Sequence, residues 1–395
     1  MPTTSSPTAG HLLQLIREGK ARTRKELGTV TGLARSTVAQ RVDQLVSLGY
    51  LREAGAGASS GGRPPTALTF DESSRVVLVA DLGVTHGRIA VTDLARRSLA
   101  EMTEEMRIDR GPEALLDFVA DAFQRLLAEA GRRADEACGI GIGVPGPVDF
   151  STGRVIQPPI MPGWHDFPIR DYLLGAFPAV GDVPVLVDND ANIMALGEWA
   201  TYWRTSPALL FVKAGTGIGA GIVIGGQVYR GIDGAAGEIG HVRVPGFDAP
   251  CACGAAGCLA VAASGSALAR SLTSDSAPVP DSRAVAALVQ AGDAAAVAAT
   301  RDAGRRLGEV LATVISLLNP EVVVIGGDLA HTHQHFITGV RSALYERLLP
   351  RSTRRLHLDI GRTGERAGVI GAAALVVDHV FSPEAVDARL AEAAA

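Results

Sequence analysis

One imidazole and three thiols lie within eighteen positions of this chain, between His241 and Cys258. The thiols follow the order Cys-x-Cys-Gly-x-x-Gly-Cys, and glycine lets the backbone turn back so that several thiolates can face one point. Three cysteines and a histidine make a closed tetrahedral zinc site, which is structural because no position is left open for water. One alternative is a set of small buried residues beside a loop histidine. The other is a disulfide, which three thiols and an expected lack of export disfavour. The predicted ligands are His241, Cys251, Cys253 and Cys258.

Length and composition limit the class of protein. A chain of 395 residues predicts two or three domains of about 100–200 residues each. Hydrophobic residues make up 47% and aromatic residues only 5%, so the core must consist of Ala, Val, Leu and Ile. The sequence contains no run of about 18 uncharged apolar residues, so it predicts no membrane-spanning helix. Residues 1–10 lack the basic and apolar blocks of a secretory signal, and we expect a disordered leader on a cytoplasmic protein.

The net charge of −5 hides an asymmetry along the chain. Residues 1–70 carry nine basic and four acidic side chains, a net charge of +5, and the remainder carries −10. A basic head on an acidic body indicates that the head meets a polyanion.

The head, residues 11–70, has the pattern of a winged helix-turn-helix. An apolar helix from His11 ends at Gly19, and Thr23 with Glu26 forms a capping-box arrangement that begins a second helix. After a turn at Thr31-Gly32, residues 35–48 place apolar side chains on one face of a third helix, and two short strands follow.

In such a domain the third helix lies in the major groove, with its first residues at the base edges. Arginine and glutamine can make bidentate contacts to guanine and adenine, and an arginine of the wing can enter a minor groove. The alternative is a small helical module that binds proteins. The predicted DNA contacts are Arg35, Ser36, Thr37, Gln40, Arg41 and, in the wing, Arg63.

The body contains three patterns that can serve a ligand. Asp81 begins an Asp-x-Gly-x-Thr turn between two strands, where a carboxylate can bind Mg²⁺ and backbone amides can face phosphates. Residues 213–221 form a glycine-rich turn between two strands, which is neither a Walker loop nor a dinucleotide loop. Asn189 and Asp190 follow a strand and open a helix, where a carboxylate can accept a proton from a hydroxyl group. Taken singly, these carboxylates could also be helix caps or surface groups.

Taken together, these segments resemble the ROK family of repressors and sugar kinases, which has the actin-like ATPase fold. The resemblance covers nearly the whole chain and implies an α/β body of two lobes behind the winged helix-turn-helix. The first lobe would span 75–188, completed by C-terminal helices 366–395, and the second would span 189–365. The implied nucleotide contacts are Asp81, Gly83, Thr85, Thr216, Gly217, Gly219, Gly326 and Gly327.

The resemblance also implies a sugar site and the same four zinc ligands. Asp190 corresponds to the catalytic base of the family's kinases. The implied sugar contacts are Gly153, Arg154, Asn189, Asp190, Glu238 and His241.

Two positions depart from the family pattern. Val84 stands where the phosphate turn has a second glycine, and its branched side chain obstructs the approach of phosphate to the backbone. Ala260 stands where the family has a sugar-binding glutamate, and loss of one charge-assisted hydrogen bond costs about 1.5–3 kcal/mol.

The sequence therefore predicts a DNA-binding repressor that responds to a sugar or sugar derivative, with structural zinc. Its expected partners are a palindromic double-stranded operator and further copies of itself, as a homodimer or homotetramer. One alternative is an ATP-dependent kinase of a hexose or N-acyl-hexosamine that also binds DNA and uses Mg²⁺-ATP. The other is a DNA-binding regulator that senses no sugar.

Overall fold

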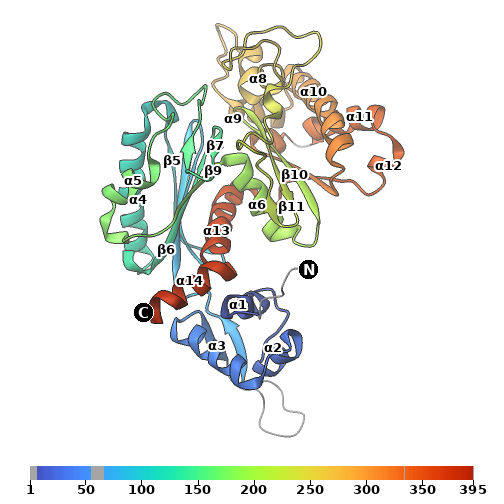
Figure 1. Cartoon of the computed structure of the whole chain (residues 1–395). Coiled ribbons are helices and arrows are strands. Elements are labelled where there is room, and N and C mark those ends of the chain that lie inside the picture. The colour runs from blue at the N-terminus through green and yellow to red at the C-terminus, as the bar shows by residue number, and fades with distance from the viewer. Residues whose placement is uncertain (1–6, 55–65, 333, 395) are drawn as a thin grey trace.

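The computed structural model describes residues 7–54, 66–332 and 334–394. A small N-terminal head lies below two larger lobes, and the C-terminal helices run from between the lobes back to the head (Figure 1). Within the described ranges, no single helix is long and apolar enough to cross a membrane. The pair Gly364–Val380 and Pro383–Ala393 reaches that length only together, across a bend of 52°.

The head consists of three helices and an antiparallel pair of strands. Its first helix begins at Ala9, inside the segment expected to be a disordered leader, because Thr8 caps it by accepting from the His11 amide. The interior is made by the apolar faces of all three helices together with Tyr50, Leu51 and Leu68. The elements are α1 (Ala9–Arg17), α2 (Arg24–Thr31), α3 (Arg35–Ser47), β1 (Leu51–Ala54) and β2 (Ala67–Phe70).

Two local signals in the head behave as the sequence indicated. The Thr23 hydroxyl accepts from the amide of Glu26 at 3.1 Å and so begins α2. The Glu26 carboxylate reaches back to the amide of Arg22 at 2.7 Å, one residue before the partner of an ordinary capping box. Gly32 ends α2 with a φ of 71°, a conformation that glycine adopts without steric cost.

The first lobe is a five-stranded sheet in the order β5-β4-β3-β6-β9. Alternate residues of β3 face opposite sides of the sheet. Val76 and Leu78 therefore pack with α4, whereas Val77 and Val79 pack with α13. The elements are β3 (Val76–Leu82), β4 (His86–Asp93), β5 (Ser98–Glu105), α4 (Pro112–Glu129), β6 (Ala137–Val144), β9 (Val185–Asn189) and α13 (Ala367–Val380).

The second lobe repeats this arrangement, with the sheet order β12-β11-β10-β13-β14. In each sheet the first strand of a hairpin pairs in parallel with a later strand: β3 with β6, and β10 with β13. Two such sheets, each covered by helices, form the actin-like two-lobed α/β body that the sequence predicted. The elements are α6 (Asp190–Tyr202), β10 (Ala208–Ala214), β11 (Ile218–Ile224), β12 (Gln227–Val228), α10 (Ala294–Leu318), β13 (Val322–Gly326), α11 (Gln334–Arg347) and β14 (His357–Ile360).

Shorter elements connect these strands and helices. They are η1 (Ile108–Arg110), η2 (Ala134–Glu136), β7 (Val148–Asp149), β8 (Arg154–Val155), α5 (Ile169–Ala176), η3 (Pro178–Val180), η4 (Ile239–His241), α7 (Leu259–Ala263), α8 (Gly265–Leu272), α9 (Ser282–Gln290), η5 (Asp328–His331), α12 (Pro350–Thr353), η6 (Gly364–Arg366) and α14 (Pro383–Ala394).

Helices α6 and α13 cross at close range between the two sheets (Figure 1). A Cβ atom at Gly371 would lie 1.6 Å from the carbonyl oxygen of Ile193, and one at Gly197 would lie 2.1 Å from that of Ala367. Only glycine fits at either position. The crossing fixes the N-terminal ends of both helices beside the space between the lobes.

The head packs against the C-terminal helices. Phe381 makes edge-to-face contacts with Tyr50 and Phe70, at centroid distances of 5.0 and 5.1 Å. Arg17 donates to the carbonyl oxygen of Phe381 at 3.1 Å and to the carboxylate of Asp378 at 2.9 Å. Helix α13 thus lies on the first-lobe sheet and ends at the head, and α14 lies against α1.

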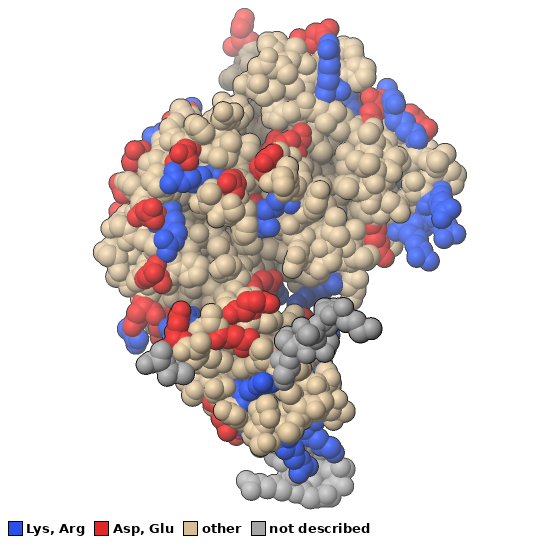
Figure 2. All heavy atoms as spheres, in the orientation of Figure 1, with Lys and Arg blue, Asp and Glu red and all other residues tan. Residues whose placement is uncertain are grey.

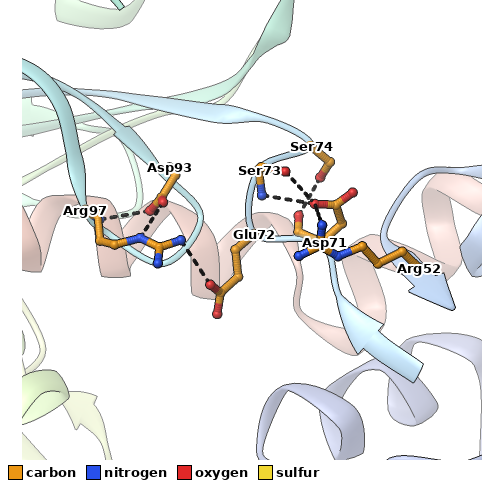
Figure 3. A network of polar contacts seen from close by, with 7 residues as sticks. All are labelled: Arg52, Asp71, Glu72, Ser73, Ser74, Asp93 and Arg97. Atoms are coloured by element: carbon orange, nitrogen blue, oxygen red, sulfur yellow. Dashed lines mark hydrogen bonds and ion pairs between the residues drawn. The ribbon is translucent and has the colours of Figure 1, made fainter. Parts of the chain in front are cut away.

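Residues 71–75, between β2 and β3, are held by polar contacts (Figure 3). The Asp71 carboxylate accepts from the amide and the hydroxyl of Ser73 at 3.1 and 2.8 Å. Arg97 pairs with Glu72 at 3.2 Å and with the buried Asp93 at 2.7 Å. The connection between head and body is therefore an ordered turn tied to the first lobe.

Candidate functional site

The two lobes enclose a cleft of about 870 Å³ that residues of both sheets line. Each edge of the cleft is formed by loops that follow strands of one sheet. Of the residues that the sequence predicted to bind sugar or nucleotide, eleven line it: Asp81, Gly83, Asn189, Asp190, Thr216, Gly217, Gly219, Glu238, His241, Gly326 and Gly327.

Three predicted residues lie elsewhere. Gly153 and Arg154 are not among the described residues that line the cleft, and their expected sugar contacts stay predictions. They belong to the β7–β8 hairpin, where Arg154 pairs instead with Asp166 at 3.0 Å. Thr85 lines a neighbouring cavity of about 350 Å³.

Asp190 is the first residue of α6 and is 5% exposed. The Asn189 side chain caps this helix by accepting from the Ala191 amide at 2.9 Å, and it donates to the Gly146 carbonyl oxygen at 3.1 Å. A carboxylate at a helix N-terminus is stabilised by the helix dipole. Asn189 and Asp190 are thus held at the cleft because the end of β9 and the start of α6 meet there.

An interaction that the sequence analysis missed fixes this segment from behind. Asp188, which is 1% exposed, accepts from the Arg230 guanidinium at 2.6 Å and from the Asn192 amide group at 2.9 Å. The guanidinium also lies over the ring of Phe150, 3.7 Å from its centroid. The Asp-Asn-Asp sequence was a signal for a constrained turn, but Arg230 follows it by 42 positions with no local pattern to reveal the pair.

Lys213, near the end of β10, makes an ion pair with Asp190. Burial lowers the pKa of Lys213, but the nearby carboxylates of Asp190, Asp81 and Asp328 outweigh it and leave that pKa raised. Burial raises the pKa of Asp81 to about 6, against the opposing effect of Lys213. In the sequence, Lys213 stands out only as the first residue of the glycine-rich turn.

The side of the cleft that the resemblance assigns to nucleotide contains the expected glycine-rich loops together with the side chains of Val84 and Lys213. Val84 lines the cleft at the phosphate turn. A Cβ at Gly368 would lie 1.9 Å from an Asp81 carboxylate oxygen, so the start of α13 covers that carboxylate. The Lys213 ammonium also acts on Asp81 from the opposite lobe. Because an ammonium group repels a divalent cation, the charge of Lys213 opposes a metal ion held at Asp81.

His241 and the three cysteines converge, with all four possible ligand atoms within 4.8 Å of one another. The Cys253 and Cys258 sulfurs are 3.7 Å apart, and the Cys251 sulfur is 3.7 Å from the Nδ1 atom of His241. A tetrahedral ion bound to thiolates at about 2.3 Å would place its sulfur ligands about 3.8 Å apart. The donor set therefore fits a single metal ion of this kind.

The metal cluster lies directly beside the cleft. The Nε2 atom of His241 faces the Glu238 carboxylate at 3.9 Å, and both side chains line the cleft. Ala260, which also lines the cleft, follows Cys258 by two positions at the start of α7. The fourth cysteine, Cys138, is buried in β6, where burial raises its pKa to about 12.

The start of α3 presents polar side chains on the surface of the head. Arg35, Ser36 and Gln40 are exposed, while Val38 and Val42 on the opposite face are buried. Thr37 and Arg41 are half-buried, and Arg41 donates to the carbonyl oxygen of Pro7. In Figure 2, Lys and Arg side chains gather at the lower end of the head. Arg63, predicted to contact DNA, lies outside the described residues.

The sequence profile of the ROK family matches residues 77–379. The xylose repressor of Caldicellulosiruptor bescii is 29% identical to the chain, over 94% of this chain and 95% of the relative. A solved ROK family transcriptional regulator, a homolog of the Escherichia coli Mlc protein, covers 97% of this chain and 98% of its own, with a TM-score of 0.80 and 26% identity.

A sugar kinase of known structure matches less of the chain. The ROK family glucokinase of Streptomyces griseus, solved with glucose and AMPPNP, covers 76% of this chain and 98% of its own, with a TM-score of 0.65 and 27% identity. The similarity to repressors thus extends over nearly the full length of this chain, and the similarity to this kinase over about three quarters of it.

Proposed function

The chain belongs to the ROK family, and on that premise we propose that it is a transcriptional repressor whose DNA binding is controlled by a sugar held between its lobes. One observation carries this proposal: a basic three-helix head and a sugar-kinase-like body occur in one chain. A xylose repressor and a transcriptional regulator match this combination over nearly the full length of the chain.

The sugar would lie in the half of the cleft next to the metal cluster. Asn189, Asp190 and Glu238 supply acceptors for sugar hydroxyl groups, and His241 supplies a ring edge beside them. The cluster of His241, Cys251, Cys253 and Cys258 would hold zinc, whose contribution is to fix the loop that carries Glu238. Because one histidine serves both sites, metal and sugar binding should be coupled.

The head would act as a winged helix-turn-helix, with α3 in the major groove of an operator. Arg35, Ser36 and Gln40 are exposed at its N-terminal end, where base edges are read. Two heads in a homodimer or homotetramer would contact the two half-sites of a palindromic operator.

Helix α13 gives the two sites a physical connection. It begins against Asp81 at the cleft and ends at Phe381 against Tyr50 of the head. A sugar that binds one arrangement of the lobes more tightly than another shifts the population toward it. A shift of α13 relative to the first sheet would then move the heads out of register with their half-sites.

The experiment that tests the DNA-binding part is selection of duplexes from a random pool by the purified full-length chain. We expect a sequence with two half-sites related by a twofold axis. Arg35→Ala should weaken its binding by about 1–3 kcal/mol, whereas the body variant Arg133→Ala should not change it. Failure to enrich any sequence would contradict the proposal.

A second candidate function is sugar phosphorylation, because Asp190 stands at the position of the kinase base and the glycine loops line the cleft. Sugar-dependent release of ADP that is lost in Asp190→Asn would establish it. Lys213 and Val84 favour the repressor without kinase activity.

A further inference from the structure

We propose that Lys213 is a built-in counterion that makes this cleft a receptor for sugar alone, by holding Asp190 as a fixed acceptor and occupying with its charge the region that a nucleotide-bound metal requires. The inference rests on the proposed function, since it assigns the sugar site a role in binding and not in phosphoryl transfer.

The position of Lys213 in the fold is the first argument. Strand β10 is central in the second sheet, and Lys213 pairs in register with Gly219 of β11 on one side and with Gly326 of β13 on the other. Both neighbours belong to the glycine-rich segments predicted to surround nucleotide phosphates. The lysine side chain therefore enters the cleft from between the two loops, and it is only 24% exposed.

The choice of cation is the second argument. The chain uses arginine for nearly all of its basic side chains, and Lys213 is the only lysine after Lys25 in the sequence. A guanidinium group is broad and planar, whereas an ammonium group is a compact point charge with donors in several directions. Only the compact group resembles a metal ion in shape.

The partners of Lys213 are the third argument. Its ammonium group pairs with Asp190, and its charge acts on Asp81 and Asp328 as well. A general base must be free to reach the substrate proton, whereas the Asp190 carboxylate is engaged by the Lys213 ammonium. The same carboxylate remains a strong acceptor of hydrogen bonds from sugar hydroxyl groups.

Magnesium is disfavoured at the same place for a reason of charge. A divalent cation held by Asp81 would stand near the Lys213 ammonium, and the two positive charges repel each other. The start of α13 lies against the Asp81 carboxylate on its other side. The nucleotide loops are thus present with a positive charge at the place where a nucleotide-bound metal would be held.

The test compares the full-length chain with Lys213→Met, which removes the charge and keeps the length of the side chain. The probe is Mg²⁺ with AMPPNP, titrated calorimetrically. We expect little or no binding by the unaltered chain and binding at least about tenfold tighter by Lys213→Met. Lys20→Met, which removes a 64% exposed lysine of the head, should behave like the unaltered chain. Equal binding by the unaltered chain and Lys213→Met would overturn the proposal.

A second measurement does not depend on folding of the variant. The unaltered chain is mixed with Mg²⁺-ATP and, in turn, xylose, glucose and N-acetylglucosamine, with Asp190→Asn as the control. We expect no ADP release above that control, and sugar-dependent release lost in Asp190→Asn would overturn the proposal. If the unaltered chain binds operator but no sugar affects it, the proposed function fails while the nucleotide titration still decides the role of Lys213.

Discussion

The two halves of the interlobe cleft differ in what their side chains can do. In the half beside the cluster of His241 and three cysteines, Asn189, Asp190 and Glu238 present acceptors. They lie at a helix cap, in an ion pair and on the loop that carries this cluster. In the other half the glycine loops are present together with Val84 and the Lys213 ammonium, whose charge acts on Asp81. The same loop geometry therefore carries different charges in the two halves, and under our proposal these charges favour binding of sugar over binding of nucleotide.

The largest expected effect is on the metal cluster, and it tests whether the sugar half depends on it. Cys251→Ser removes one of four ligands, so zinc, measured by elemental analysis, should fall from about one per chain to well below that value. Sugar-dependent release from DNA should be lost because the loop carrying Glu238 is no longer fixed.

The matched control is Cys138→Ala, which removes the cysteine outside the cluster and should retain zinc. A normal sugar response in Cys251→Ser would show that sugar binding does not depend on the metal ligands, and would contradict the proposed coupling.

The next effect concerns the carboxylate shared by the two halves. Asp190→Asn keeps the shape of the side chain but removes its charge and leaves Lys213 unpaired. Loss of a charge-assisted hydrogen bond of about 1.5–3 kcal/mol should weaken sugar binding by roughly 10- to 150-fold in calorimetric titration. Asp182→Asn, at a position where the side chain is 88% exposed, should bind sugar normally. Unchanged affinity in Asp190→Asn would place the sugar elsewhere.

A smaller effect distinguishes the side-chain volume of Val84 from the charge of Lys213 as the cause of weak nucleotide binding. Val84→Gly removes the side chain at the phosphate turn but leaves Lys213 in place. Because the charge remains, we expect binding of Mg²⁺-AMPPNP to change by less than about threefold. A large gain in affinity from Val84→Gly alone would show that bulk, and not charge, excludes nucleotide.

The smallest effect is a pH dependence of stability that arises from Asp81. Its pKa is raised by burial from 3.8 to about 6, so the folded chain holds a proton in a range where the unfolded chain has released it. This carboxyl therefore lowers the free energy of unfolding progressively as the pH rises through about 4 to 6, and the full cost is present above that range. Asp81→Asn should gain about 1 kcal/mol relative to the unaltered chain between pH 5 and pH 8, measured by denaturant unfolding. A constant difference between the two proteins over this range would contradict the burial of this charge.

Much of the fold and the metal cluster could be predicted because the signals are local. The spacing of Cys251, Cys253 and Cys258 with two bending glycines indicates converging thiols, and Thr23 begins α2 where its side chain predicted. The two-lobed fold was implied by the resemblance to the ROK family, which the strands and glycine loops of the body carry.

The electrostatic interactions of the cleft could not be predicted in this way. The pairs of Lys213 with Asp190 and of Arg230 with Asp188 join residues 23 and 42 positions apart, and depend on how helix and strand pack. The hairpin that carries Arg154 was expected at the sugar site from resemblance alone. In the structure this side chain pairs with Asp166, and its sugar contact stays a prediction.

Control of DNA binding by sugar can be measured by fluorescence anisotropy of the full-length chain on its selected duplex, titrated with a panel of sugars that begins with xylose. We expect at least one sugar to weaken DNA binding by about tenfold or more, a coupling of about 1.4 kcal/mol, without any nucleotide, and Asp190→Asn to abolish this effect. DNA binding that no sugar in the panel changes, or that changes equally in Asp190→Asn, would contradict the proposed control by sugar.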